Sequence, residues 1–171
     1  MRKLCGRDVK VSHGLAESLA QLAEQPPEFS SRVADFIDGL VSHYVLDDGK
    51  LVVAHAGMKE TMAGRGSAAV REFALYGERT GETDAYGLPV RVAWAEDYRG
   101  RAAVVYGHTP SLHPEWLNNT LCVDTGCVFG GKLTALRWPE RELVQVDALR
   151  VHCVSAKPLE MERPATETKT P

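Results

Sequence analysis

Short runs of β-branched and apolar residues, each ending at a polar residue beside glycine, are the dominant pattern of this chain. The runs are Leu51–Ala54, Ala102–Tyr106 and Thr120–Val123. The first run leads into His55, the second into Gly107–His108, and the third into Asp124. Such runs are typical of buried strands that end in tight loops. Loops at the carboxyl ends of strands are where α/β proteins usually place their chemistry. The pattern therefore predicts an α/β fold with a site at one edge of the sheet.

Apolar residues recur at helical spacing in other parts of the chain. The segment 15–24 is predicted to be a helix that Pro26–Pro27 closes, and Ser30 or Ser31 can cap a second helix whose apolar stripe reaches Tyr44. Ser67 is predicted to begin a third helix that ends near Leu75.

Period-two alternation and turn residues predict the remaining strands. Asp47–Gly49 is a turn signal before the strand that ends at Ala54, and residues 76–88 are predicted to form a long surface loop. Further strands are expected over Asp8–Val11, Lys132–Arg137, Leu143–Val146 and Leu149–Val154, of which the second and third form a hairpin.

The chain has 171 residues, 44% of them hydrophobic and 25% charged, and these are the proportions of a globular protein with a buried core. The net charge of −3 gives no general attraction for nucleic acid, so a polynucleotide would need a local patch or a bound cation. From Ser155 onward apolar residues become few. We therefore expect one domain portion over residues 1–154 and a linker or disordered tail over residues 155–171.

The four cysteines form no C-x-x-C pair, which favours reduced thiols in a cytoplasmic protein. No segment approaches the ~20 apolar residues of a membrane span, so we expect no membrane partner. The basic start of the chain is not followed by an apolar segment of signal-peptide length.

Two histidines and an aspartate at neighbouring strand ends, His55, His108 and Asp124, could bind a transition metal or serve as an acid–base site. Residue types alone do not separate these functions from hydrogen-bonded loop residues, and Asp124 before Thr125–Gly126 is also a typical Asx-turn former. His13 has the same local pattern, and His43 beside the second helix is expected to be structural. The segment Gly64–Ser67 could hold an anion at a helix start or could be a glycine turn with a cap.

Three motifs at these positions resemble the later motifs of calcineurin-like metallophosphoesterases. They are Val53–Gly57, Tyr106–Pro110 and Val123–Leu133. Phe73–Asp84 and Gly87–Arg91 further resemble the central phosphatase module of bacterial polynucleotide kinase-phosphatases. The resemblance extends from Lys3 to about Leu149 and implies a layered β-sandwich flanked by helices.

The resemblance implies specific roles for the candidate residues. His55 and His108 would be ligands of one metal of a binuclear Mn-type pair, and Asp124 would lie in the active site near the metals or the substrate phosphate. The implied reaction is metal-dependent removal of 2′- or 3′-phosphates from RNA or DNA ends during RNA repair, with a metal-activated hydroxide as the nucleophile. Kinase and ligase-type domains in a longer chain would be its partners.

The sequence departs from this family pattern upstream. The motifs G-D-x-H-G, G-D-x-x-D-R-G and G-N-H-[DE], which supply the other ligands in the family, do not occur. We therefore expect a metallophosphoesterase domain that is truncated at its N-terminus. Two alternatives stay open, namely a bis(5′-nucleosyl)-tetraphosphatase, whose bacterial examples share the His108 and Asp124 motifs, and a catalytically silent fragment or binding half.

Overall fold

The computed structural model describes residue 4, residues 6–11 and residues 14–159, and the chain divides into two compact units after Val41. The first unit contains α1 (Leu15–Ala23) and α2 (Pro27–Gly39). The predicted helix over residues 15–24 is therefore confirmed. The second helix begins earlier than Ser30, because Pro27 occupies a first-turn position that needs no N–H donor.

Two other predictions for this part of the chain are wrong. Residues 8–11 form no strand. The second helix ends at Gly39, and Tyr44 belongs to a strand instead. Only Ala34 of α2 is buried. His13 and Cys5 lie outside the described residues.

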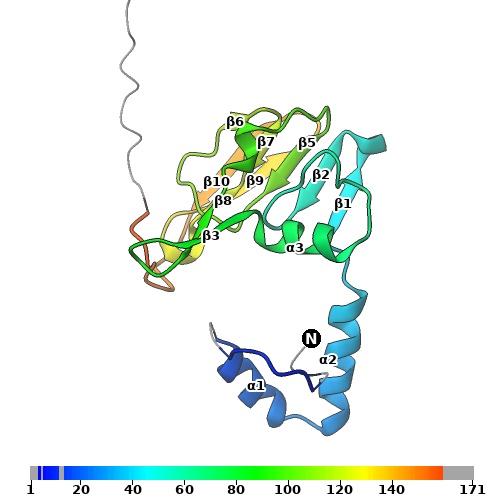
Figure 1. The fold of residues 1–171 in the computed structure, drawn as a ribbon. Coiled ribbons are helices and arrows are strands. Elements are labelled where there is room, and N and C mark those ends of the chain that lie inside the picture. The colour runs from blue at the N-terminus through cyan, green and yellow to red at the C-terminus, as the bar shows by residue number, and fades with distance from the viewer. Residues whose placement is uncertain (1–3, 5, 12–13, 160–171) are drawn as a thin grey trace, which may run out of the picture. The chain divides into compact units, whose positions relative to one another are not determined.

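A mixed five-stranded sheet forms the centre of the second unit (Figure 1). Its order is β1 (His43–Leu46), β2 (Leu51–Ala54), β5 (Ala103–Tyr106), β7 (Thr120–Cys122) and β6 (Trp116–Leu117). The three central strands are parallel, and the edge strands β1 and β6 are antiparallel to their neighbours. Central parallel strands are covered on both faces, which explains why they are continuous apolar runs. The predicted turn at Asp47–Gly49 and the three predicted site strands are confirmed, and the turn joins β1 and β2 as a hairpin.

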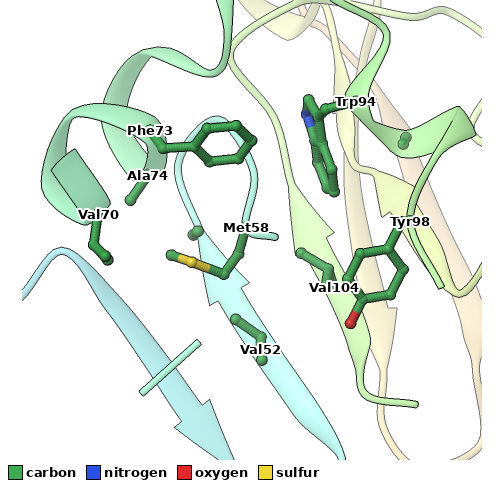
Figure 2. Close-up of a cluster of buried hydrophobic side chains, with 10 residues drawn as sticks. Val52, Met58, Val70, Phe73, Ala74, Trp94, Tyr98 and Val104 are labelled. Atoms are coloured by element: carbon green, nitrogen blue, oxygen red, sulfur yellow. The ribbon is translucent and has the colours of Figure 1, made fainter. Parts of the chain in front are cut away.

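Helix α3 (Ala68–Tyr76) covers one face of this sheet (Figure 2). Its Val70, Phe73 and Ala74 belong to one buried cluster with strand residues Val52 and Val104. The loop residue Met58 and the aromatic rings of Trp94 and Tyr98 complete the cluster, and the Trp94 ring meets those of Phe73 and Tyr98 edge-on. Most of the apolar core of the second unit therefore lies on this side of the sheet.

The opposite face of the central sheet packs against a second sheet. Leu51, Ala103 and Val105 form a smaller buried cluster with Leu136 of β9. This second sheet has the order β10 (Glu142–Asp147), β9 (Lys132–Arg137) and β8 (Asp124–Thr125). The β9–β10 hairpin was predicted, and the second unit is a layered α/β structure in which two sheets face each other.

Two predictions for the outer segments are wrong. Residues 76–88 are not a loop throughout, since β3 (Arg79–Thr83) and β4 (Pro89–Arg91) form a two-stranded hairpin. The Asp84 carboxylate accepts the N–H groups of Tyr86 and Leu88, each at 2.9 Å, and so forms the turn between them. Residues 149–154 form no strand, and residues 155–159 are irregular.

Short 3₁₀ helices η1 (Asp47–Gly49), η2 (Trp94–Glu96) and η3 (Cys127–Phe129) connect these elements. Across the residues that the structure describes, none of the helices has the length and apolar character needed to span a bilayer.

Candidate metal and phosphate site

Backbone hydrogen bonds bring His55, His108 and Asp124 to the same edge of the central sheet. The Gly107 N–H donates to the His55 carbonyl at 2.8 Å, so the β2–β5 pairing continues past the strand ends. A side chain at Gly107 would be crowded, because a Cβ built there would lie 3.0 Å from the Asp124 Cβ and 3.8 Å from the His55 carbonyl oxygen. The three residues therefore surround one glycine, as the parallel strand ends predicted.

The imidazoles of His55 and His108 are in direct contact. His55 Nε2 lies 2.9 Å from His108 Nδ1, and the ring centroids are 4.7 Å apart. The backbone of His108 has a φ of 75°, a left-handed conformation that is uncommon outside glycine. His108 Nε2 is buried and has no hydrogen-bond partner among the described residues. A buried unpartnered nitrogen is costly, and ligand binding is one way to remove that cost.

The surroundings of His108 favour its neutral form. Burial, followed by the positive charges of Arg91 and His55, lowers the pKa of His108 to about 4, and the Asp124 carboxylate only partly opposes them. Neutral imidazole is the form that binds a metal ion, so His108 is available as a ligand at pH 7 without losing a proton.

The donor set fits part of a transition-metal site. Imidazole nitrogens suit Zn, Mn or Fe, and His108 Nε2 is buried without a hydrogen-bond partner among the described residues. Within residue 4, residues 6–11 and residues 14–159, no group of three His, Cys, Asp or Glu side chains is arranged to hold a metal. The described part of the chain thus brings the predicted histidine pair together, and Asp124 does not join it as a third ligand.

Asp124 has a defined local role. Its Oδ1 accepts the Gly126 N–H at 3.1 Å, and its carbonyl accepts the Ser111 N–H at 2.9 Å. The first bond is an Asx turn, so this structural alternative for Asp124 is confirmed. The same bonds hold the carboxylate in place beside Gly107.

Two arginines near the histidine pair were missed by the sequence analysis. Arg79 of β3 and Arg91 of β4 are directly opposite each other, and both positive charges act on His108. Arg91 Nη1 donates to the Tyr76 carbonyl. Burial, and then the charge of Arg79, lowers the pKa of Arg91. Like charges on directly opposed residues are unfavourable, and an anion between them would relieve this repulsion.

A usable signal for these arginines was present in the sequence. The turn formers Asp84 and Gly87 lie between two polar, strand-compatible segments. A hairpin around that turn brings the two arginines onto paired strands, and a register shift between Arg79 and Thr83 sets Arg79 opposite Arg91. The many Gly, Thr and charged residues between 76 and 88 favoured a loop instead.

The other candidate sites have structural explanations. Ser67 Oγ accepts the Val70 N–H at 3.2 Å, so the start of α3 has the serine cap rather than an anion site as its observed feature. The His43 ring bonds Ser42 Oγ and the Gly64 N–H, which confirms a structural role for His43. Cys122, Cys127 and Cys153 are free cysteines.

Comparison with known proteins connects this fold to hydrolases of dinucleoside polyphosphates. The structure matches a crystal structure provisionally assigned as that of a diadenosine tetraphosphatase, with a TM-score of 0.52 and 23% identity, over 77% of this chain and 60% of the other. At that identity the match establishes a shared fold. No protein-family model matches the chain.

Curated relatives are much more similar in sequence. The asymmetrical bis(5′-nucleosyl)-tetraphosphatase PrpE of Anoxybacillus flavithermus is 47% identical over 149 residues, which cover 85% of this chain and 61% of the relative. PrpE of Geobacillus thermodenitrificans is 46% identical over 155 residues, which cover 88% of this chain and 63% of the relative. The chain is homologous to these hydrolases over most of its length and spans about three fifths of theirs.

These relatives bear on two of the alternatives that the motifs left open. They favour the tetraphosphatase alternative over the phosphatase that acts on polynucleotide ends. The more specific resemblance to polynucleotide kinase-phosphatases receives no support from them.

Proposed function

We propose that this chain carries the histidine and arginine part of a metal-dependent active site that cleaves dinucleoside tetraphosphates asymmetrically. The observation that carries the proposal is the joint position of the paired imidazoles and the opposed arginines, within a chain that is 47% identical to such a hydrolase over 149 residues. His55 and His108 would hold a divalent ion, for which Mn is our first candidate. Such an ion, when bound, supplies a Lewis acid and lowers the pKa of a bound water.

The residues of the chain itself have distinct tasks in this proposal. Arg79 and Arg91 bind oxygens of the polyphosphate, because planar guanidinium groups match phosphate geometry and a tetraphosphate offers several anionic groups in a row. Asp124 Oδ1 is engaged by the loop, so we assign Asp124 Oδ2 to accept a hydrogen bond from the attacking water or the leaving group. The neutral state of His108 keeps its ring available as a ligand.

A chimera tests the proposal directly. The matched 149 residues of the Anoxybacillus relative are replaced by the corresponding segment of this chain. With Mn²⁺ and bis(5′-adenosyl) tetraphosphate, we expect equal amounts of ATP and AMP by anion-exchange chromatography. His55→Ala and His108→Ala should each lose this activity and bind Mn²⁺ more weakly. An RNA with a 3′-phosphate serves as the competing substrate.

Two results would contradict the proposal. A folded chimera that binds Mn²⁺ and does not cleave the tetraphosphate would refute the substrate assignment. Full activity in His55→Ala would refute the metal assignment, since a ligand substitution should cost most of the activity.

A further inference from the structure

A groove of about 390 Å³ runs alongside the loop that follows Asp124. Its walls include Leu112, Phe129, Gly130, Gly131, Val151 and Val154. This volume lies within the roughly 300–1,000 Å³ that is usual for small-molecule sites. None of the described residues that line the groove carries a charged side chain. The groove therefore suits an uncharged, largely apolar group and does not suit a phosphate chain.

Hydrogen bonds link two segments that line the groove to Asp124 of the candidate site. The Ser111 N–H donates to the Asp124 carbonyl, and Leu112 follows directly as one wall. On the other side, the Gly126 N–H donates to Asp124 Oδ1, and the Phe129 N–H donates to the Gly126 carbonyl at 2.9 Å. Both walls are thus fixed relative to the Asp124 carboxylate.

The structure already holds the groove in shape. The N–H groups of His152 and Cys153 both donate to the Val128 carbonyl at 3.0 Å, which holds the Val151 segment against the loop. A Cβ at Gly130 would lie 2.7 Å from Val151 Cγ2, so only glycine permits this approach. The ring of Phe129 is half-buried at the groove.

We propose that this groove binds the purine base of one nucleoside of the substrate, an inference that rests on the proposed function. Phosphates held by the arginines leave a nucleoside to be placed farther along the molecule, and the uncharged groove beside Asp124 offers apolar walls and an aromatic ring for a base. Aromatic side chains stack on bases at a gain that corresponds to roughly 5- to 150-fold in affinity. If one of the two nucleosides is held in the groove, its position also determines which phosphate along the chain is attacked, counted from that nucleoside.

Binding of adenosine to the full 171-residue chain, without metal, tests the inference. Adenosine has no phosphate, so it probes the groove independently of the metal and the arginines. In ¹H–¹⁵N NMR titrations we expect shifts at the amides of Gly130, Gly131 and Val151. Phe129→Ala should weaken binding by roughly 10-fold. Val128→Ala, which changes an exposed neighbour outside the groove lining, should bind as the unchanged chain does.

Val154→Asp provides a second variant that does not depend on the folding of Phe129→Ala. The Val154 side chain is 86% exposed, so the fold should tolerate the change, and a carboxylate on the groove wall should weaken adenosine binding. Absence of shifts at the groove, or equal shifts with ribose 5-phosphate in place of adenosine, would overturn the inference. If adenosine binds at the groove but the chimera does not cleave the tetraphosphate, the groove stays a base-binding site and the proposed function is refuted. If the chimera cleaves inorganic tetraphosphate as efficiently as the dinucleotide, the role of the groove in substrate binding is refuted and the proposed function stands.

Discussion

Gly57, two residues after His55, is the position where an added methyl group tests the packing of the core most directly. Gly57 has a φ of 141°, and a Cβ there would lie 2.5 Å from both Cε2 and Cζ2 of Trp94. Trp94 cannot move away easily, because its ring is 5.8 Å from that of Phe73 and 4.9 Å from that of Tyr106. Gly57→Ala therefore combines a steric clash in the core with a backbone conformation that alanine avoids.

The two costs can be estimated separately. Overpacking in a core costs about 1–3 kcal/mol, and a non-glycine residue at such a positive φ costs about 1–3 kcal/mol. We therefore expect Gly57→Ala to lower the free energy of unfolding by about 2–6 kcal/mol, out of the ~5–15 kcal/mol of a typical domain. Gly81→Ala is the matched control, since Gly81 has a φ of 91° and nothing within 4 Å of an added Cβ. It should show the backbone cost alone.

A double-mutant cycle with Trp94→Leu isolates the clash. The leucine side chain removes the indole atoms that the new Cβ would meet, so Gly57→Ala should cost about 1–3 kcal/mol less in that background. Urea unfolding is followed by the fluorescence of Trp116 and Trp138, which all four proteins keep. Equal costs of Gly57→Ala in the two backgrounds, within about 0.5 kcal/mol, would refute the packing argument.

Three further outcomes follow from individual side chains. Leu121→Ala should lower the free energy of unfolding by about 3–5 kcal/mol in urea titrations, because Leu121 is 0% exposed, whereas Leu117→Ala, at 44% exposed, should cost far less. Burial raises the pKa of Cys122 to about 11, so its thiol stays protonated at pH 8 and should react with iodoacetamide much more slowly than exposed Cys153. The rate of Cys122 labelling should rise toward pH 11. Equal labelling of the two cysteines at pH 8, measured by mass spectrometry, would contradict this. In the chimera, Arg91→Gln should lower kcat/KM by roughly 10- to 100-fold, and Arg91→Lys should restore only part of it, since lysine cannot bind phosphate in a bidentate manner.

The sequence was most informative about the buried strands. Leu51–Ala54, Ala103–Tyr106 and Thr120–Cys122 are apolar apart from the buried Thr120 because both faces are covered, and a nearly continuous apolar run indicates such a strand. Because β2 and β5 are parallel, their carboxyl ends lie at the same edge of the sheet, and His55 and His108 therefore lie at that edge. Their contact at 2.9 Å could not be read from residue spacing, since it depends on the register between β2 and β5.

The segments that sequence analysis described incorrectly are largely exposed. All residues of β3 are exposed, so no hydrophobic alternation marks this strand, and the arginine pair was hidden with it. The apolar stripe of the second helix suggested a helix as far as Tyr44, whereas Tyr44 pairs with Val53 in the β1–β2 hairpin. Strand pairing in this hairpin overrode the helical periodicity there.

The parallel pairing of β2 with β5 also has a consequence for folding kinetics. His55 and His108 are 53 positions apart, and a whole hairpin and helix α3 lie between them. Closing a loop of this length costs entropy that local contacts do not repay, so such pairings tend to form slowly. An ion that needs both imidazoles can bind well only after this pairing has formed. Metal added during refolding should therefore slow unfolding more than it speeds folding, and its affinity would report the completed β2–β5 register.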